Sequence, residues 1–140
     1  RKFKRCRMKA NELMVGDWVL INGVPKKIQA VDGVDDEIMA DDEMLCLAED
    51  RYHSEDKATG IHLTPEILKK NGWKKDSGGE ECWANSKAWF TPHEYGKRDT
   101  IKSWEVEICG KPNSFDGVIK YVHELQQALR LCGIKKQIEL

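Results

Sequence analysis

The sequence has no long apolar run, and its basic start is not followed by an apolar stretch. A transmembrane helix needs at least about 18 consecutive apolar residues, and a secretory signal peptide needs an apolar core behind its basic end. With 40% hydrophobic and 34% charged residues, the composition is that of a globular chain. We therefore expect a cytoplasmic protein with no membrane partner.

Cysteines are present, but none forms a C-x-x-C pair. The five cysteines are odd in number and widely spaced: Cys6, Cys46, Cys82, Cys109 and Cys132. A disulfide framework needs paired cysteines, and a structural zinc site needs closely spaced ligands, so this pattern argues against both. We expect reduced, mostly buried thiols, no metal and no cofactor.

Motifs for phosphate binding and for acid–base catalysis are also missing. The glycine-containing turn at 76–80 is acidic and would repel an anion. Paired carboxylates such as Asp35-Asp36 and Asp41-Asp42 lie in loop-like segments without the apolar surroundings that general-acid work needs. The sequence contains no catalytic constellation, so we expect a protein that is not an enzyme.

Charge is distributed unevenly along the chain. Residues 1–7 hold five basic residues, and the rest of the chain holds 18 basic against 24 acidic residues. We expect residues 1–7 to be an extension outside the fold, with Met8 as the natural start. Residues 32–56 hold eleven acidic residues and one basic residue, which is typical of a solvated loop or sheet face. This acidity disfavours nucleic acid as a partner.

Short segments joined by tight turns predict a β unit over residues 8–52. Residues 18–21 alternate between the two faces of a strand, and Asn22-Gly23 favours a hairpin because both positions tolerate positive φ. Residues 28–31 continue the partner strand, and residues 44–48 predict a third strand across the acidic loop. We expect an SH3-like barrel or a curled meander.

A second unit is predicted over residues 61–140, and it begins with a two-turn helix within 63–73. Thr64 can cap this helix, Pro65 suits its first position, and Gly72 can end it in the left-handed conformation. Trp73, just past the glycine, can fold back onto the helix.

Strands are predicted after this helix. Residues 81–90 predict a strand or a hairpin that bends at Asn85-Ser86, and residues 91–100 predict a polar loop. Residues 101–109 alternate cleanly between apolar and polar side chains, which indicates a half-buried strand. Residues 137–140 predict a final short strand.

A long helix is predicted over residues 117–133. Its apolar residues recur at helical spacing and form one stripe: Val118, Val122, Leu125, Leu129 and Cys132. The fold class is therefore α+β, with one short and one long helix packed on one face of an antiparallel sheet. We expect the two units to share one core.

His123 lies beside this stripe, about 100° around the helix from Val122. We expect it to be a boundary residue that bonds a backbone carbonyl or water. Two alternatives stay open: a nucleophile at Cys109, and a metal site drawn from His53, His62, His93, His123, Cys82, Cys109 and Cys132. The aromatic set Trp83, Trp89, Phe90, Tyr95 and Trp104 predicts core more than a stacking or peptide-binding platform.

Three segments, MKANELMVGDWV (8–19), IHLTPEILKKNGW (61–73) and IKYVHELQQAL (119–129), resemble a family of small uncharacterised proteins from prophages and other mobile elements of anaerobic gut bacteria. The resemblance covers about a quarter of the chain and implies a start at Met8. It implies no known activity. Tyr121, His123 and Gln126 match the family pattern, whereas QALRLCGI replaces its usual aromatic-rich ending.

From these observations we expect a non-enzymatic accessory protein of a phage or mobile element, acting as a binding or adaptor module for a protein partner. The possible partner-binding residues are Trp18, Tyr121, His123 and Gln126, where Trp18 belongs to the predicted SH3-like hairpin. One alternative is an acidic nucleic-acid mimic that inhibits a host DNA-binding factor. A second alternative is a metal- or thiol-dependent enzyme.

Overall fold

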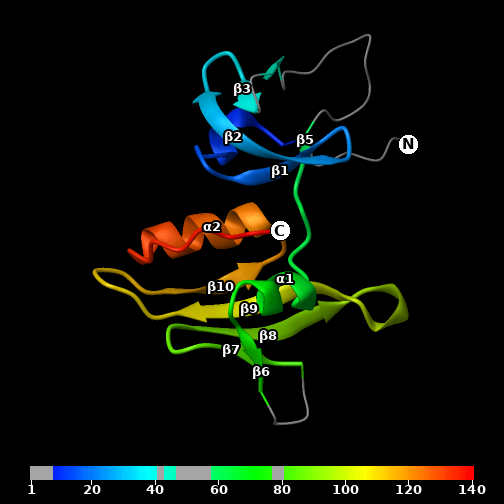
Figure 1. The fold of residues 1–140 in the computed structure, drawn as a ribbon, viewed down its shortest axis with the longest axis vertical. Coiled ribbons are helices and arrows are strands. Elements are labelled where there is room, and N and C mark those ends of the chain that lie inside the picture. Colours follow the sequence, from blue (N-terminus) through cyan, green and yellow to red (C-terminus); the bar gives the residue numbers. More distant parts are fainter. Residues whose placement is uncertain (1–7, 41–42, 47–57, 77–80) are drawn as a thin grey trace. The chain divides into compact units, whose positions relative to one another are not determined.

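The computed structural model describes residues 8–40, 43–46, 58–76 and 81–140 (Figure 1). The chain divides into two compact units, Arg1–Ile61 and His62–Leu140. Together they contain two five-stranded antiparallel sheets and two α-helices, so the predicted α+β class is confirmed. In the described part of the chain, no helix has the length and apolarity needed to cross a membrane. Predictions for residues 1–7 and 47–57 lie outside the described residues.

The sheet of the first unit has the strand order β4-β3-β2-β1-β5. Its strands are β1 (Trp18–Ile21), β2 (Val24–Asp32), β3 (Glu37–Ala40), β4 (Glu43–Cys46) and β5 (Ala58–Thr59). The predicted hairpin between β1 and β2 is present, and both turn residues have positive φ, 50° at Asn22 and 82° at Gly23. A 3₁₀ turn, Ala10–Glu12, precedes the sheet and contributes Ala10 to the core.

The described strands of this unit form a meander and do not close a barrel; residues 47–57, between β4 and β5, lie outside the described residues, so the SH3-like barrel stays a prediction. Strands β1 to β4 each pair with the next one in the chain, and β4 and β5 stand at opposite ends of the strand order. The acidic stretch was predicted as a solvated loop or sheet face, and β3 lies within the part expected to be a loop before residue 44. Ile38 and Ala40 of β3 are buried, since their inward side chains alternate with Glu37 and Met39.

The second unit has the strand order β10-β9-β8-β7-β6. Its elements are α1 (Pro65–Lys70), β6 (Lys74–Lys75), β7 (Trp83–Ala84), β8 (Ala88–Tyr95), β9 (Ile101–Ile108), β10 (Phe115–Ile119) and α2 (Val122–Leu131). The predicted short helix, the hairpin at Asn85-Ser86 and the strand over 101–109 are confirmed. The polar loop predicted at 91–100 is wrong for its first half, because Thr91–Tyr95 continue β8 against β9.

One face of this sheet is buried against the helices, and the other is open. Phe90, Trp104 and Val106 are fully buried, whereas Trp89, Glu105 and Glu107 between them are exposed. The buried side chains of the helices, including Leu68 of α1 and Leu125 and Leu129 of α2, complete the core of the unit. The predicted alternation in β9 fails at Ser103, which is buried and donates a hydrogen bond to Glu94.

The long helix begins later than predicted. Residues 115–119 form strand β10, which pairs with β9 from Phe115↔Ile108 to Ile119↔Trp104. Val118 is therefore half exposed on the open face, and the buried stripe begins at Val122. The helix starts where the Glu124 carboxylate accepts hydrogen bonds from the backbone N–H groups of Lys120 and Tyr121, at 2.9 and 2.8 Å.

The strand predicted at 137–140 is wrong. Residues 134–140 follow α2 without pairing into a sheet, although Ile138 is buried. We call residues 134–140 the C-terminal segment. The side chain of Asn71, the residue just after α1, forms hydrogen bonds with the backbone of this segment in place of a strand.

Candidate functional site

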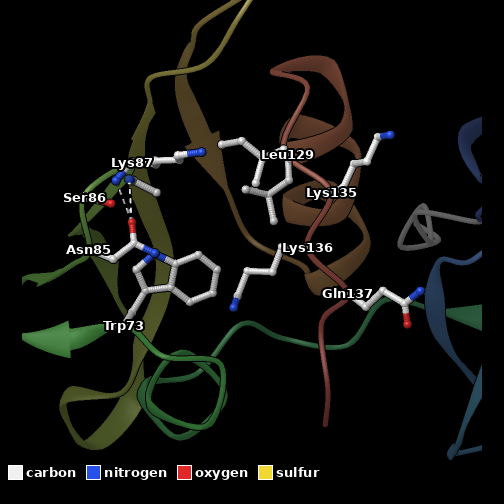
Figure 2. Close-up of a pocket in the computed structure, with 10 residues that line it drawn as sticks. Trp73, Asn85, Ser86, Lys87, Leu129, Lys135, Lys136 and Gln137 are labelled. Carbon is white, nitrogen blue, oxygen red and sulfur yellow. Dashed lines mark hydrogen bonds between the residues drawn. The ribbon is translucent and has the colours of Figure 1, made fainter.

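A pocket of about 420 Å³ lies in the second unit, between the β7–β8 turn, the end of α2 and the C-terminal segment (Figure 2). Its apolar floor consists of Trp73, Ala88, Leu129 and Ile134, and its polar rim consists of Asn85, Ser86, Lys87, Lys135, Lys136 and Gln137. The volume lies in the range of small-ligand sites, and the lining is more polar than that of most of them.

Trp73 is placed by the sharp ending of α1. The helix starts with Thr64, whose hydroxyl accepts a hydrogen bond from the backbone N–H of Ile67 at 3.3 Å. It ends at Gly72, whose φ of 94° turns the chain so that the Trp73 N–H donates to the Leu68 carbonyl at 3.0 Å. The Trp73 ring then meets Phe90 edge-on, with centroids 5.0 Å apart. As the sequence predicts, Trp73 folds back towards the helix, and only 2% of it is exposed.

Asn71 attaches the C-terminal segment to α1. Its amide nitrogen donates to the carbonyls of Ile67 and Glu139, at 2.8 and 2.7 Å, and its oxygen accepts from the Glu139 N–H at 2.8 Å. The Lys70 ammonium also donates to the Leu140 carbonyl. These bonds hold the segment whose lysines, Lys135 and Lys136, form one wall of the pocket.

The opposite wall is the tight turn between β7 and β8. The Asn85 side-chain oxygen accepts hydrogen bonds from the N–H groups of Lys87 and Ala88, at 2.8 and 2.9 Å, as the dashed lines in Figure 2 show. The Lys87 carbonyl in turn accepts from the N–H of Cys109 at 2.8 Å. The turn is therefore held by its own hydrogen bonds and by one from Cys109, which follows β9.

The pocket is positively charged and rich in hydrogen-bond donors. None of Lys87, Lys135 and Lys136 forms an ion pair with a carboxylate of the described residues. The Lys136 Nζ lies 5.4 Å from the centroid of the Trp73 ring. The indole N–H groups of Trp73 and Trp83 are buried and have no acceptor among the described residues, and of these two residues only Trp73 lines the pocket.

The residues that the sequence singled out for partner binding do not line this pocket. Trp18 lies on β1 of the first unit, half-buried, with the Lys27 ammonium 5.4 Å from its ring centroid. Tyr121 and His123 are brought together, because their rings stack with centroids 5.7 Å apart. His123 is buried rather than at a wet boundary, and Gln126 is buried as well, because α2 packs more of its circumference than its apolar stripe indicates.

The metal alternative finds no support in histidine and cysteine positions. Among the described residues, the only group of three close potential ligands is Asp32, Asp35 and Glu37, near the start of the acidic stretch. The Asp32 carboxylate already accepts hydrogen bonds from the N–H groups of Val34 and Asp35, at 3.0 and 3.2 Å. These contacts are those of an Asx turn, which explains the cluster without an ion. His53 lies outside the described residues.

The thiol alternative concerned Cys109, whose side chain is exposed at the end of β9. Cys132 lies nearby in the core. Burial raises the pKa of the Cys132 thiol, and the neighbouring Cys109 raises it further. Its sulfur lies 3.9 Å from the Ile108 carbonyl, so Cys132 behaves as a small neutral core residue.

The aromatic set divides between the two faces of the sheet. Trp83, Phe90 and Trp104 belong to the core, whereas Trp89 and Tyr95 are exposed. Of the pocket residues, Trp73, the Asn85-Ser86 turn and Leu129 carried structural predictions, Gln137 belonged to the strand wrongly predicted at 137–140, and no role was predicted for Lys87, Lys135 and Lys136. A pair of lysines just after the glycine that ends a helix is a weak signal, because their folded neighbours lie far away in the sequence.

Comparison of this chain with protein-family models, with curated proteins and with solved structures finds no match.

Proposed function

We propose that the protein is a non-enzymatic binding or adaptor module and that the Trp73 pocket holds the group it recognises. One observation carries the proposal: a pocket with an apolar floor is lined by three lysines and a buried indole N–H, and among the described residues the lysines have no carboxylate partner and the indole N–H has no acceptor. Buried donors are normally satisfied, and an unsatisfied one costs roughly 1–3 kcal/mol. A bound group with acceptor oxygens removes that cost.

The chemistry of the pocket supports binding rather than turnover. Its lining side chains include no carboxylate, imidazole or thiol, which are the usual proton acceptors and nucleophiles of catalysis. Its lysines are exposed, whereas catalytic lysines are usually desolvated so that they lose their proton.

The resemblance to prophage proteins is the reason to propose an accessory role in a phage or mobile element. The acidic-mimic alternative depends on the charge run at 32–56, and most of its carboxylates lie outside the described residues. The acidic-mimic alternative therefore stays a prediction.

The test is affinity capture from cell extract with the full chain as bait. A pocket variant, Lys87→Glu/Lys136→Glu, is compared with a control, Lys97→Glu/Lys102→Glu, which makes the same charge change at exposed lysines outside the pocket. We expect the wild type and the control to retain a bound molecule that the pocket variant loses. Identical capture by all three proteins, or recovery of a chemically converted molecule, would contradict the proposal.

A further inference from the structure

The polar groups around the pocket are mainly donors. The Trp73 indole supplies an N–H, and the three lysines supply ammonium groups. The Asn85 side-chain oxygen is already occupied by the N–H groups of Lys87 and Ala88, so this side chain offers its NH₂ group. Only Ser86 and Gln137 retain side-chain acceptors. Such a lining favours a ligand with negatively charged acceptor oxygens.

The floor of the pocket requires a second property of the ligand. The partly exposed Ile134 presents aliphatic carbon, and the nearly buried Leu129 and Trp73 ring lie at the base of the pocket. Figure 2 shows the indole of Trp73 pointing into the space between the Asn85–Lys87 turn and Lys136. A fully hydrated inorganic anion would leave this apolar surface uncovered, whereas an anion attached to an apolar body would cover it.

We propose that the pocket binds a carboxylate attached to an apolar body, a chemistry shared by the C-terminus of a polypeptide with a large apolar last residue and by a free aryl or alkyl carboxylic acid. One carboxylate oxygen accepts a hydrogen bond from Trp73 Nε1, and the charge is balanced by Lys87 and Lys136. The apolar body lies against Leu129 and Ile134. This inference rests on the proposed function, since it names the group that the binding module recognises.

Binding requires a small local movement. The Trp73 Nε1 atom is covered in the ligand-free protein. The indole N–H lies in the plane of the ring, so the ring edge must shift to expose it, and the exposed Lys136 over the ring face belongs to a segment without strand pairing and follows at low cost. The ligand oxygen then takes a position next to the indole N–H, and the ammonium group pairs with the carboxylate.

The test uses three matched probes on the full chain: the peptide acetyl-Ala-Ala-Phe as a free acid, the same peptide as a C-terminal amide, and 3-phenylpropionate. Binding is followed in ¹H–¹⁵N NMR spectra through the indole N–H signal of Trp73, which the variant Trp73→Phe identifies by deleting it. We expect the free acid to shift this signal and to bind at least 10-fold more tightly than the amide. If 3-phenylpropionate binds as tightly as the peptide acid, the ligand is a small acid; if it binds more weakly, the ligand is a chain terminus.

Variants assign the roles of the individual groups. Trp73→Phe keeps an aromatic floor but removes the donor, and we expect it to weaken binding of the tighter acid by about 10-fold, as for a hydrogen bond to a charged group. Lys87→Gln/Lys136→Gln should weaken it at least as much, whereas Lys97→Gln/Lys102→Gln should leave it unchanged.

Two results would overturn this inference. Equal binding of the peptide acid and the peptide amide would show that the carboxylate is not recognised. Tighter binding of inorganic phosphate than of either acid would show that the apolar body is not recognised. In either case, loss of capture by the pocket variant in cell extract would still uphold the proposed binding module, so the two failures are distinguishable.

Discussion

Trp73 and Trp104 both contact the ring of Phe90, and their indole N–H groups differ in whether they have an acceptor. Both rings are at most 2% exposed, and both meet Phe90 edge-on, with centroids 5.0 and 6.4 Å away. The indole N–H of Trp104 donates to the Leu63 carbonyl at 2.9 Å, whereas the indole N–H of Trp73 has no acceptor among the described residues. The difference separates a buried tryptophan whose donor is satisfied within the fold from one whose donor has no acceptor among the described residues.

The two tryptophan rings also differ in what surrounds them. Trp104 is enclosed by sheet and backbone, and its partner Leu63 is itself buried. Trp73 lines the pocket and has an ammonium group over its ring. Of these two buried donors, the one enclosed by the sheet has an acceptor, and the one beside the pocket has none among the described residues.

The largest expected effect comes from removing the ring that both tryptophans contact. Phe90→Ala should lower the free energy of unfolding by about 3–5 kcal/mol, because it leaves a cavity between two large side chains. Urea unfolding followed by tryptophan fluorescence measures this, since four of the five tryptophans lie in the second unit. Trp89→Ala, at the adjacent exposed position, is the control and should cost less than about 1 kcal/mol.

Asn71→Ala tests the attachment of the C-terminal segment, which forms one wall of the pocket that Trp73 lines. The substitution removes three hydrogen bonds from a side chain that is 6% exposed, so we expect a loss of about 2–3 kcal/mol and weaker ligand binding. The control Asn113→Ala removes one exposed bond, to the Leu131 carbonyl at 3.3 Å, and should cost less than about 0.5 kcal/mol. Equal losses in the two variants would show that the C-terminal segment is not held by Asn71.

Paired tryptophan-to-phenylalanine substitutions isolate the N–H groups themselves. Trp104→Phe and Trp73→Phe remove the same atoms, but only the first leaves a carbonyl without its donor. We therefore expect Trp104→Phe to cost about 1–2 kcal/mol more in unfolding free energy than Trp73→Phe. The measurement is the same urea titration in ligand-free buffer. A larger loss from Trp73→Phe would mean that its N–H already has a partner.

The smallest expected effect is that of the ammonium group over Trp73. Lys136→Gln should lower stability by no more than about 0.5–1 kcal/mol, the size of an exposed cation–π contact. Lys135→Gln, one residue earlier and without such a contact, should have no measurable effect on the urea midpoint. If both variants unfold at the wild-type midpoint, the contact contributes to binding alone.

The elements that could be predicted from the sequence are those specified by neighbouring residues. Asn22-Gly23 determines the first hairpin, Thr64 and Gly72 determine both ends of α1, and the alternation after Trp104 identifies β9. Strand β10 was predicted as the start of the long helix, because its few residues also match a helical period. In the fold, pairing with β9 makes them a strand. Strand β3 was missed for another reason, because acidic residues flank its four residues on both sides.

The candidate site was less accessible to prediction, because its parts come together only in the fold. Asn71 and Glu139 are 68 residues apart in the chain. The missing acceptor of Trp73 is a property of the folded environment, and Trp73 and Trp104 look alike in the sequence. His123 attracted attention as a chemically versatile residue, yet the structure places it in the packing of α2 against its own unit.

The attachment of the C-terminal segment has a thermodynamic consequence for recognition. Residues 134–140 are held by Asn71, Lys70 and the buried Ile138 rather than by a strand ladder, so the segment has its own opening equilibrium. Only the closed state presents both walls of the pocket. The apparent dissociation constant therefore equals the intrinsic one divided by the closed fraction, and any change that loosens the segment weakens binding without touching the ligand.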